Sequence, residues 1–270
     1  MVKRREFFLS TVAGSLSSVA AVGAQGDGPL RVGVIGHSGR GNYGHGLDTV
    51  WSRLPETMIV GVADANPEGL VKAKEKLKVK AGFSDYRTML NDLKPDIAAV
   101  CPRHVDQHRD MILAAIEAGV RGIYCEKPFV QTPAQADDVV TACEAHHVKL
   151  AVAHRNAWHP VLPAMSRLIE DGLIGTVLEV RGRGKGDRRG GAEDLWVLGT
   201  HVLDLMCRIA GEPVSCSGRV FLDGSPLTGA GVEEEGAEGL GPLGGDELHA
   251  RYHFDGGLTG SFDSFANDGT

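Results

Sequence analysis

The sequence has 270 residues, of which 42% are apolar and 23% are charged, and its formal net charge is -7 at pH 7. Because domains average roughly 150 residues, this length predicts two domains, each large enough for a core of its own. The absence of a basic excess argues against nucleic acids and other polyanions as partners.

Residues 1–26 have the three regions of an export signal. A charged start is followed by an apolar stretch through Ala21, and Val22-Gly23-Ala24 resembles a cleavage site. The Arg4-Arg5 pair resembles a twin-arginine signal. The apolar stretch is shorter than the roughly 20 residues of a membrane span, and no other segment comes close to that length. We therefore predict a periplasmic protein whose mature chain has no membrane span; the alternative is a frayed basic tail.

Short apolar runs alternate with helix-like stretches between residues 29 and 155. We expect strands at 31–36, 58–64, 97–102, 122–128 and 149–154. Their apolarity on both faces indicates parallel strands that are covered by helices. The alternation predicts an α/β, doubly wound parallel sheet with right-handed crossovers.

The pattern changes after residue 155. Helical stretches at 159–172 and 194–210 are mixed with strand-like runs at 176–184, 214–222, 247–254 and 258–265, in which apolar and polar residues alternate. This alternation is typical of an antiparallel sheet with one solvated face. Residues 156–270 therefore predict an α+β domain, and because it is short we expect it to be incomplete. The acidic, glycine-rich segment 223–247 is expected to be a long surface loop, too polar to pack.

Five cysteines, Cys101, Cys125, Cys143, Cys207 and Cys216, lack any spacing typical of a metal site. Their odd number argues against a complete disulfide framework. Free cysteine behaves as a small hydrophobic residue, so we predict packing roles for all five and no bound metal.

A glycine-rich turn follows the first expected strand. Gly36 and Gly41 occupy the first and third positions of a GxGxxG frame, while Ser38 stands in the second position with Gly39 and Arg40 beside it. Such a turn presents backbone amides and a helix N-terminus to a pyrophosphate. These five residues are therefore predicted to bind a dinucleotide, although the Ser38 side chain should narrow the approach to the phosphate.

Asp64 ends the second expected strand. A carboxylate at this place can accept hydrogen bonds from an adenosine ribose and would repel a 2′-phosphate, which favours NAD over NADP. Asp64 could instead, or in addition, be a turn residue before the helix start at Asn66-Pro67.

Two opposite charges, Glu126 and Lys127, follow the apolar fifth strand and precede Pro128. In an open parallel sheet, ligands lie outside the carboxyl ends of the strands. The two charges are therefore expected at the ligand, whereas the alternative is an ordinary solvated strand end.

The glycine turn, the Glu126-Lys127-Pro128 motif, and segments 101–119 and 199–213 together resemble the Gfo/Idh/MocA family of NAD(P)-dependent oxidoreductases. The resemblance spans roughly residues 30–213. It implies a Rossmann domain followed by a domain whose open, mainly antiparallel sheet often mediates homo-oligomers. We therefore expect a homo-oligomer if the second domain is complete.

The resemblance also implies roles for particular residues. Lys127 and His201 correspond to the catalytic residues that handle the proton of the substrate hydroxyl. From its position alone, Asp204, one helical turn after His201, is expected to orient or charge-stabilise that histidine, or to contact substrate. Arg155, after the sixth strand, is expected to bind substrate oxygens. The family has an aspartate four residues before the histidine, where this chain has Val197. Glu193 or Asp194 could substitute for it.

Pro102, Arg103 and His104 follow the fourth strand, and this position places them to touch the nicotinamide or its ribose. Glu126 and Lys127 are expected to bind the cofactor as well. His108 is expected to cap or pack its helix. The implied activity is NAD-dependent oxidation or reduction of a sugar, polyol or similar hydroxylated molecule. Two alternatives stay open: an NAD-dependent glycosidase that oxidises its substrate transiently, and a dinucleotide-binding protein without catalysis.

Overall fold

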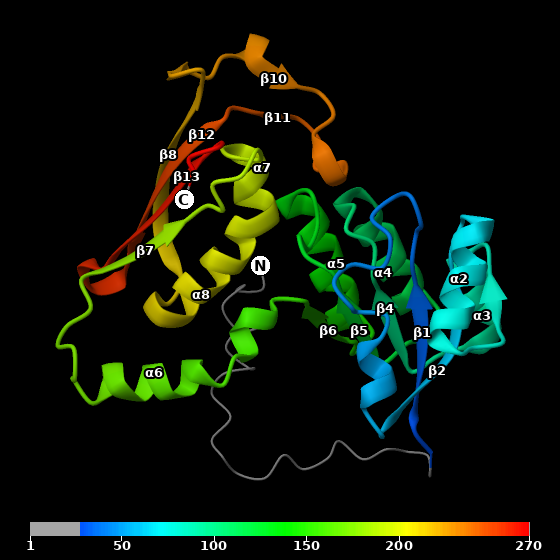
Figure 1. Ribbon diagram of the computed structural model, residues 1–270. Coiled ribbons are helices and arrows are strands. Elements are labelled where there is room, and N and C mark those ends of the chain that lie inside the picture. The colour runs from blue at the N-terminus through cyan, green and yellow to red at the C-terminus, as the bar shows by residue number, and fades with distance from the viewer. Residues whose placement is uncertain (1–27, 270) are drawn as a thin grey trace.

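In the computed structural model, which describes residues 28–269, two separate sheets form the two halves of the protein (Figure 1). The predicted export signal lies outside the described residues. Within those residues, no helix is both long and apolar enough to cross a membrane. The six-stranded sheet belongs to the N-terminal half and the five-stranded sheet to the C-terminal half.

The N-terminal sheet is parallel throughout and has the strand order β3-β2-β1-β4-β5-β6. Its strands are β1 (Leu30–Ile35), β2 (Thr57–Ala63), β3 (Gly82–Phe83), β4 (Ile97–Val100), β5 (Gly122–Cys125) and β6 (Lys149–Val152). The five predicted strands are confirmed. Strand β3 was not predicted, because two residues are too few to show a periodicity. The chain reverses direction across the sheet between β1 and β4, and this is the switch point where such sheets bind ligands.

Helices cover both faces of this sheet (Figure 1). They are α2 (Pro67–Leu77), α3 (Tyr86–Leu93), α4 (His108–Glu117) and α5 (Pro133–Ala145). Local sequence sets their starts: the Asn66 side chain accepts from the Gly69 amide, and Thr132 accepts from the Gln135 amide. The strands between them are fully buried at Val32, Val34 and Ile35.

The connection from β1 to β2 contains no α-helix. Residues 36–49 form successive turns, followed by a short 3-10 helix, η1 (Val50–Arg53). Gly39, Gly41, Gly44 and Gly46 all have positive φ angles, which a right-handed helix cannot contain. The prediction of a helix N-terminus at the pyrophosphate is therefore wrong. Any phosphate contact here must come from loop amides and side chains.

The C-terminal half has the predicted α+β organisation. Its sheet has the order β7-β13-β12-β8-β9, with β7 (Glu179–Arg183) parallel to β13 (Thr259–Phe265). The strands β12 (Glu247–Phe254), β8 (Pro213–Leu222) and β9 (Ser225–Pro226) are antiparallel to their neighbours. A continuous helical run covers one face and consists of α7 (Ala192–Asp194), the π-helical η4 (Leu195–Gly199) and α8 (Thr200–Ala210).

A third helix, α6 (Val161–Glu170), joins the two halves after the short η3 (Arg155–Trp158). It has no buried residue. Figure 1 shows it extending below the second sheet, away from the parallel sheet.

The glycine-rich segment 223–247 is not a free surface loop. It contains β10 (Val232–Glu233), which pairs with β11 (Leu243–Gly244), and two short 3-10 turns, η5 (Gly229–Gly231) and η6 (Ala237–Gly239). Figure 1 shows this orange segment arching from the second sheet toward α4 and α5. Leu240 is 6% exposed and packs with Val105 and Val197. The expectation that the segment is too polar to pack was wrong, because one leucine at its tip is enough to anchor it.

The cysteines only partly follow the prediction. Cys101, Cys125 and Cys143 are buried, Cys207 is half-buried and Cys216 is exposed on β8. A packing role is therefore wrong for Cys216, whose strand presents an almost wholly exposed face. Among residues 28–269, no three side chains of His, Cys, Asp or Glu gather as a metal site would require.

Candidate active site

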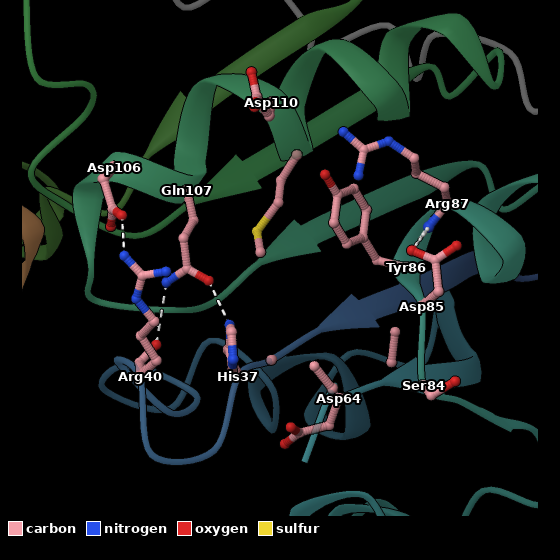
Figure 2. A pocket seen from close by; sticks show the side chains of 14 residues that line it. His37, Arg40, Asp64, Ser84, Asp85, Tyr86, Arg87, Asp106, Gln107 and Asp110 are labelled. Carbon is pink, nitrogen blue, oxygen red and sulfur yellow. Dashed lines mark hydrogen bonds and ion pairs between the residues drawn. The ribbon is translucent and has the colours of Figure 1, made fainter. Parts of the chain in front are cut away.

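A cavity of about 360 Å³ lies at the switch point of the parallel sheet. Its wall is built from residues that follow β1, β2 and β3 and from the start of α4 (Figure 2). Gly36, His37 and Arg40 come from the glycine turn, and Asp64 comes from the end of β2. The volume falls within the roughly 300–1,000 Å³ of small-molecule sites, so the cavity is large enough for part of a dinucleotide.

The glycine turn is shaped by close contacts at its two frame glycines. A side chain at Gly36 would clash with the Tyr43 ring, and a side chain at Gly41 would clash with the backbone nitrogens of Arg103 and His104. Gly41 also has a φ of +89°. Gly39, at φ +84°, has open space where its side chain would be. The frame glycines therefore serve packing within the protein, whereas Gly39 leaves the turn accessible.

Asp64 is the anchor of this turn. Its carboxylate is 1% exposed and accepts hydrogen bonds from the Ser38 amide (3.0 Å), the Ser38 hydroxyl (2.7 Å), the Tyr43 hydroxyl (2.8 Å) and the Asn66 amide (2.9 Å). The Tyr43 pKa is raised by burial and by this carboxylate. Ser38 therefore turns its side chain toward Asp64, and its expected narrowing of the phosphate approach was wrong.

The turn is also joined to the loop after β4. The Arg103 amide donates a hydrogen bond to the Gly41 carbonyl (3.1 Å), and Arg40 forms an ion pair with Asp106. The Gln107 side chain bonds to the Arg40 carbonyl (3.2 Å) and to His37 Nδ1 (2.5 Å). Figure 2 shows the Arg40 and His37 contacts crossing from one loop to the other. These contacts hold the two loops together beside the cavity.

Glu126 supports the glycine turn from beneath. It is 1% exposed, and its carboxylate accepts from the His45 amide (3.3 Å) and from the Lys127 amide (3.1 Å). A side chain at Gly44 would clash with it. The alternative of a solvated strand end is therefore wrong for Glu126, whose contact with the cofactor stays a prediction. Pro102 is buried as well, and its carbonyl oxygen lies 2.6 Å from Nε2 of His108.

Lys127 and His201 come together between the two halves of the protein. Lys127, 6% exposed, follows β5 and donates from Nζ to the Val197 carbonyl at 2.8 Å. Burial lowers the Lys127 pKa. His201 lies in the first turn of α8, where burial and the Lys127 charge lower its pKa to about 4. His201 is therefore neutral at physiological pH, and one of its ring nitrogens can accept a hydrogen bond.

The predicted partners of His201 lie elsewhere. Asp204 is paired with His154 (3.3 Å) and with Arg208 (3.0 Å), so the expectation that it orients His201 was wrong. Its charge still raises the His201 pKa, as charge stabilisation predicts, although burial and Lys127 outweigh this effect. The Nδ1 atom of His201 is buried without a hydrogen-bond partner. Arg155 is exposed at the start of η3, and Arg103 is half-exposed and pairs with Glu238 of the glycine-rich segment at 3.7 Å.

Val197 does not take part in a polar site. It is 8% exposed and packs with Val105 and Leu240, while its carbonyl receives Lys127 from within the π-helical turn η4. Asp194 does not replace the missing carboxylate, because it is buried and accepts from the Ser264 hydroxyl (2.7 Å) and the Lys185 amide (2.9 Å). The buried Asp194 carboxylate therefore does not stand in for the aspartate that Val197 replaces.

Sequence reasoning missed three contributors to the site. Tyr43 fills the space at Gly36, Leu240 closes the contact between the two halves, and His154 reaches α8 from the end of β6. His154 had a detectable signal, since it ends a predicted strand on the ligand side of the sheet. Tyr43 and Leu240 had none, because their partners are brought near only by folding.

Comparisons with known proteins agree with this architecture. Residues 30–154 match the Gfo/Idh/MocA family model described as an oxidoreductase family with an NAD-binding Rossmann fold. D-apiose dehydrogenase of Paraburkholderia graminis is 35% identical over 129 residues, which are 47% of this chain and 33% of that protein. Levoglucosan dehydrogenase of Pseudarthrobacter phenanthrenivorans is 28% identical over 232 residues, which are 76% of this chain and 58% of that protein.

Solved structures share the fold. An oxidoreductase from Agrobacterium radiobacter, in complex with NAD+, L-tartaric acid and magnesium, superposes with a TM-score of 0.68 at 20% identity, over 87% of this chain and 66% of that one. The WlbA dehydrogenase from Bordetella pertussis, in complex with NADH and UDP-GlcNAcA, gives 0.70 at 19% identity, over 88% and 71%. Residues 30–154 of this chain therefore match the NAD-binding Rossmann domain of the Gfo/Idh/MocA oxidoreductases.

Proposed function

We propose that this protein is an NAD-dependent oxidoreductase that acts on an alcohol group of a sugar, polyol or related small molecule. The observation that carries the proposal is that Lys127 is bonded to the Val197 carbonyl, one helical turn before His201, and that its charge helps to lower the His201 pKa. The names of the two relatives, a dehydrogenase of D-apiose and a dehydrogenase of levoglucosan, support this substrate class.

The chain's residues fit a dinucleotide at the switch point. The cavity there offers space for the adenosine end, Gly39 leaves the turn open, and the buried Nδ1 of His201 lacks a partner within the protein. A bound nicotinamide would supply the acceptor or donor of a hydride. Lys127 would polarise the substrate oxygen, and neutral His201 would hydrogen-bond the substrate and hold it in place.

The charges of the cavity favour NAD over NADP. Four carboxylates line it, from Asp64, Asp85, Asp106 and Asp110, against the two guanidinium groups of Arg40 and Arg87. Arg40 is already paired with Asp106. A 2′-phosphate would therefore meet an excess of negative charge, and calorimetric titration should give a lower Kd for NAD than for NADP.

The proposed activity is tested by mixing the purified protein with NAD+ and a panel of pentoses, anhydrosugars and polyols while NADH absorbance is followed. Formation of NADH that is lost in Lys127→Met and His201→Gln supports the proposal. NAD binding without oxidation of any member of the panel, in either direction, would contradict it. Aryl glycosides belong in the same panel, since phenol release without net NADH indicates the glycosidase alternative.

We also propose export through the twin-arginine route, on the basis of Arg4-Arg5 and the signal-like residues that follow them. A protein that needs a nucleotide would then load it in the cytoplasm before leaving as a folded molecule. Residues 1–26 fused to a reporter should direct it to the periplasm, and replacement of both arginines by lysine should abolish this transport. A reporter that stays in the cytoplasm with the intact signal contradicts the proposal.

Self-association through the second sheet is proposed as well. Strand β8 is exposed along most of its length, including Val214 at 63%, so this sheet has a face and an edge available to a second copy. Light scattering should then give at least twice the monomer mass of 28.6 kDa. A monomer at all concentrations would overturn it.

A further inference from the structure

His154 connects the end of the parallel sheet to the helical run of the second half. It follows β6, and its ring lies between two residues of α8. Nδ1 is 3.3 Å from Asp204 Oδ1, and Nε2 is 2.9 Å from the Thr200 hydroxyl. Asp204 is held in turn by Arg208, whose Nε lies 3.0 Å from Oδ2. The four side chains form one chain of polar contacts that none of the roles assigned above uses.

The chemistry of these groups gives every hydrogen bond a direction. An ionised carboxylate only accepts, so the Nδ1 atom that faces Asp204 carries the proton. Nε2 of the neutral ring is then an acceptor, and the Thr200 hydroxyl donates to it. A hydroxyl has two lone pairs, so Thr200 Oγ1 can still accept a proton from a third group. This arrangement, in which a carboxylate holds an imidazole that faces a hydroxyl, is suited to proton transfer.

His201 lacks that support. The two imidazole rings are close, with centroids 5.6 Å apart, but Nδ1 of His201 is buried without a partner and no carboxylate contacts the ring. The groups around the pair are Lys127 on the β5 side, Arg155 next in the chain, and Asp204 with Arg208 on α8. Only His154 has a carboxylate in direct contact that would stabilise the ring once it is protonated.

We propose that His154, positioned by Asp204, is the terminal proton acceptor of this site and that the Thr200 hydroxyl relays the proton to it. The inference rests on the proposed oxidoreductase function. As the substrate hydroxyl loses its proton to Thr200 Oγ1, the Thr200 proton passes to His154 Nε2 and leaves an imidazolium paired with Asp204. The two electrons of the substrate C–H bond leave as hydride to the nicotinamide, so the carbon is oxidised, the cofactor is reduced and one proton is stored.

The geometry is tested without turnover. In nitrogen-15 NMR spectra of the full chain at neutral pH, His154 should be in the Nδ1–H tautomer, and Asp204→Asn should weaken that preference. Assignment comes from the spectrum of His154→Gln, and the exposed His146→Gln serves as the matched control. An Nε2–H tautomer in the wild-type protein overturns the proposal.

The relay is tested by kinetics on whichever substrate the panel above identifies. His154→Gln and Thr200→Val should each lower kcat by roughly 10²-fold, the lower end for proton-transfer groups, with KM changed less than about threefold. Thr200→Ser, which keeps the hydroxyl, should restore most of kcat, and a purely structural role for Thr200 would not predict this rescue. The increase in melting temperature on addition of NAD should be the same in these variants as in the wild type.

The two proposals fail in different ways. If the wild-type protein oxidises its substrate and His154→Gln or Thr200→Val keeps kcat within threefold, the relay is refuted and the oxidoreductase function stands. If the wild-type protein oxidises nothing, the oxidoreductase function and the relay both fail, and the tautomer result alone decides the paired geometry of His154 and Asp204.

Discussion

Lys127 donates a hydrogen bond from Nζ to the backbone carbonyl of Val197, 2.8 Å away, and so joins the end of β5 to the π-helical turn of the second half. π-Helical turns inside α-helices are frequent at functional sites, where they free a carbonyl or redirect a side chain. Here the carbonyl holds the lysine while the Val197 side chain faces Val105 and Leu240. The same residue thus positions an expected catalytic group and closes the contact between the two halves.

Replacing Val197 with aspartate should destabilise the protein. The new carboxylate would lie in an apolar cluster at a position that is 8% exposed, and an unpaired polar group there costs about 1–3 kcal/mol. Urea unfolding at pH 7 measures this loss. The matched control is Val161→Asp, at a position that is 58% exposed, which should stay within about 0.5 kcal/mol of the wild type. A Val197→Asp protein as stable as the wild type would mean that the side chain turns to Lys127 instead.

Truncation of Leu240 to alanine should loosen the glycine-rich segment. Leu240 is buried in a small cluster, so we expect a loss of about 2 kcal/mol, at the low end for buried leucines. Hydrogen exchange should become faster over residues 237–244. Leu178→Ala is the control, since Leu178 is 74% exposed. Equal exchange rates in the two variants would show that Leu240 does not anchor the segment.

Changing Ser38 to alanine should weaken the fold and strengthen NAD binding. The serine hydroxyl is bonded to Asp64 at 2.7 Å, and its loss should cost about 1 kcal/mol of stability. The same loss frees one acceptor site on Asp64 for a ribose hydroxyl, so the Kd for NAD should fall. Calorimetry checks the affinity, with the exposed Ser52→Ala as control. Weaker NAD binding by Ser38→Ala would indicate that the hydroxyl contacts the cofactor directly.

Stability should depend on pH through His201. Its pKa is lowered to about 4 by burial and by Lys127, whereas an unfolded histidine titrates at about 6.5. Between these values the unfolded chain binds more protons than the folded protein, so the free energy of unfolding falls as the pH is lowered from about 6.5 toward 4. Denaturant unfolding at pH 7.5, 5.5 and 4.5, chosen as roughly bracketing that window, should show a smaller decline in His201→Gln than in the wild type. An identical decline would assign the pH dependence to other groups.

The local pattern of apolar and capping residues was sufficient to predict most strands and helix starts. The apolar runs that became β1, β2, β4, β5 and β6 are each four or more residues long, and the caps Asn66 and Thr132 begin their helices where the sequence places them. Alternation of polar and apolar residues likewise identified β7, β8, β12 and β13. The two-residue β3 and the turns after Gly36 were not predicted, because neither shows a repeating pattern of apolar residues.

The sequence pattern also predicted residues of the site, but it did not predict which side chains they would pair with. Lys127 and His201 lie near each other, as expected. In contrast, Asp204 pairs with His154, the Ser38 hydroxyl bonds to Asp64, and Glu126 is buried under the glycine turn. One helical turn of spacing puts Asp204 near His201 along α8, but the imidazole of His154, which follows β6, contacts the Asp204 carboxylate across the interface. Spacing within one element could not reveal that competitor.

The sequence by itself determined the parallel sheet, the ends of its helices and the strand ends at which chemistry is expected, because periodicity, caps and strand ends are properties of neighbouring residues. Only the tertiary structure decided which side chains are paired, which are buried and that Leu240 closes the two halves together. Those outcomes depend on distances between segments as far apart as Val105 and Leu240, and such distances exist only after the chain has folded.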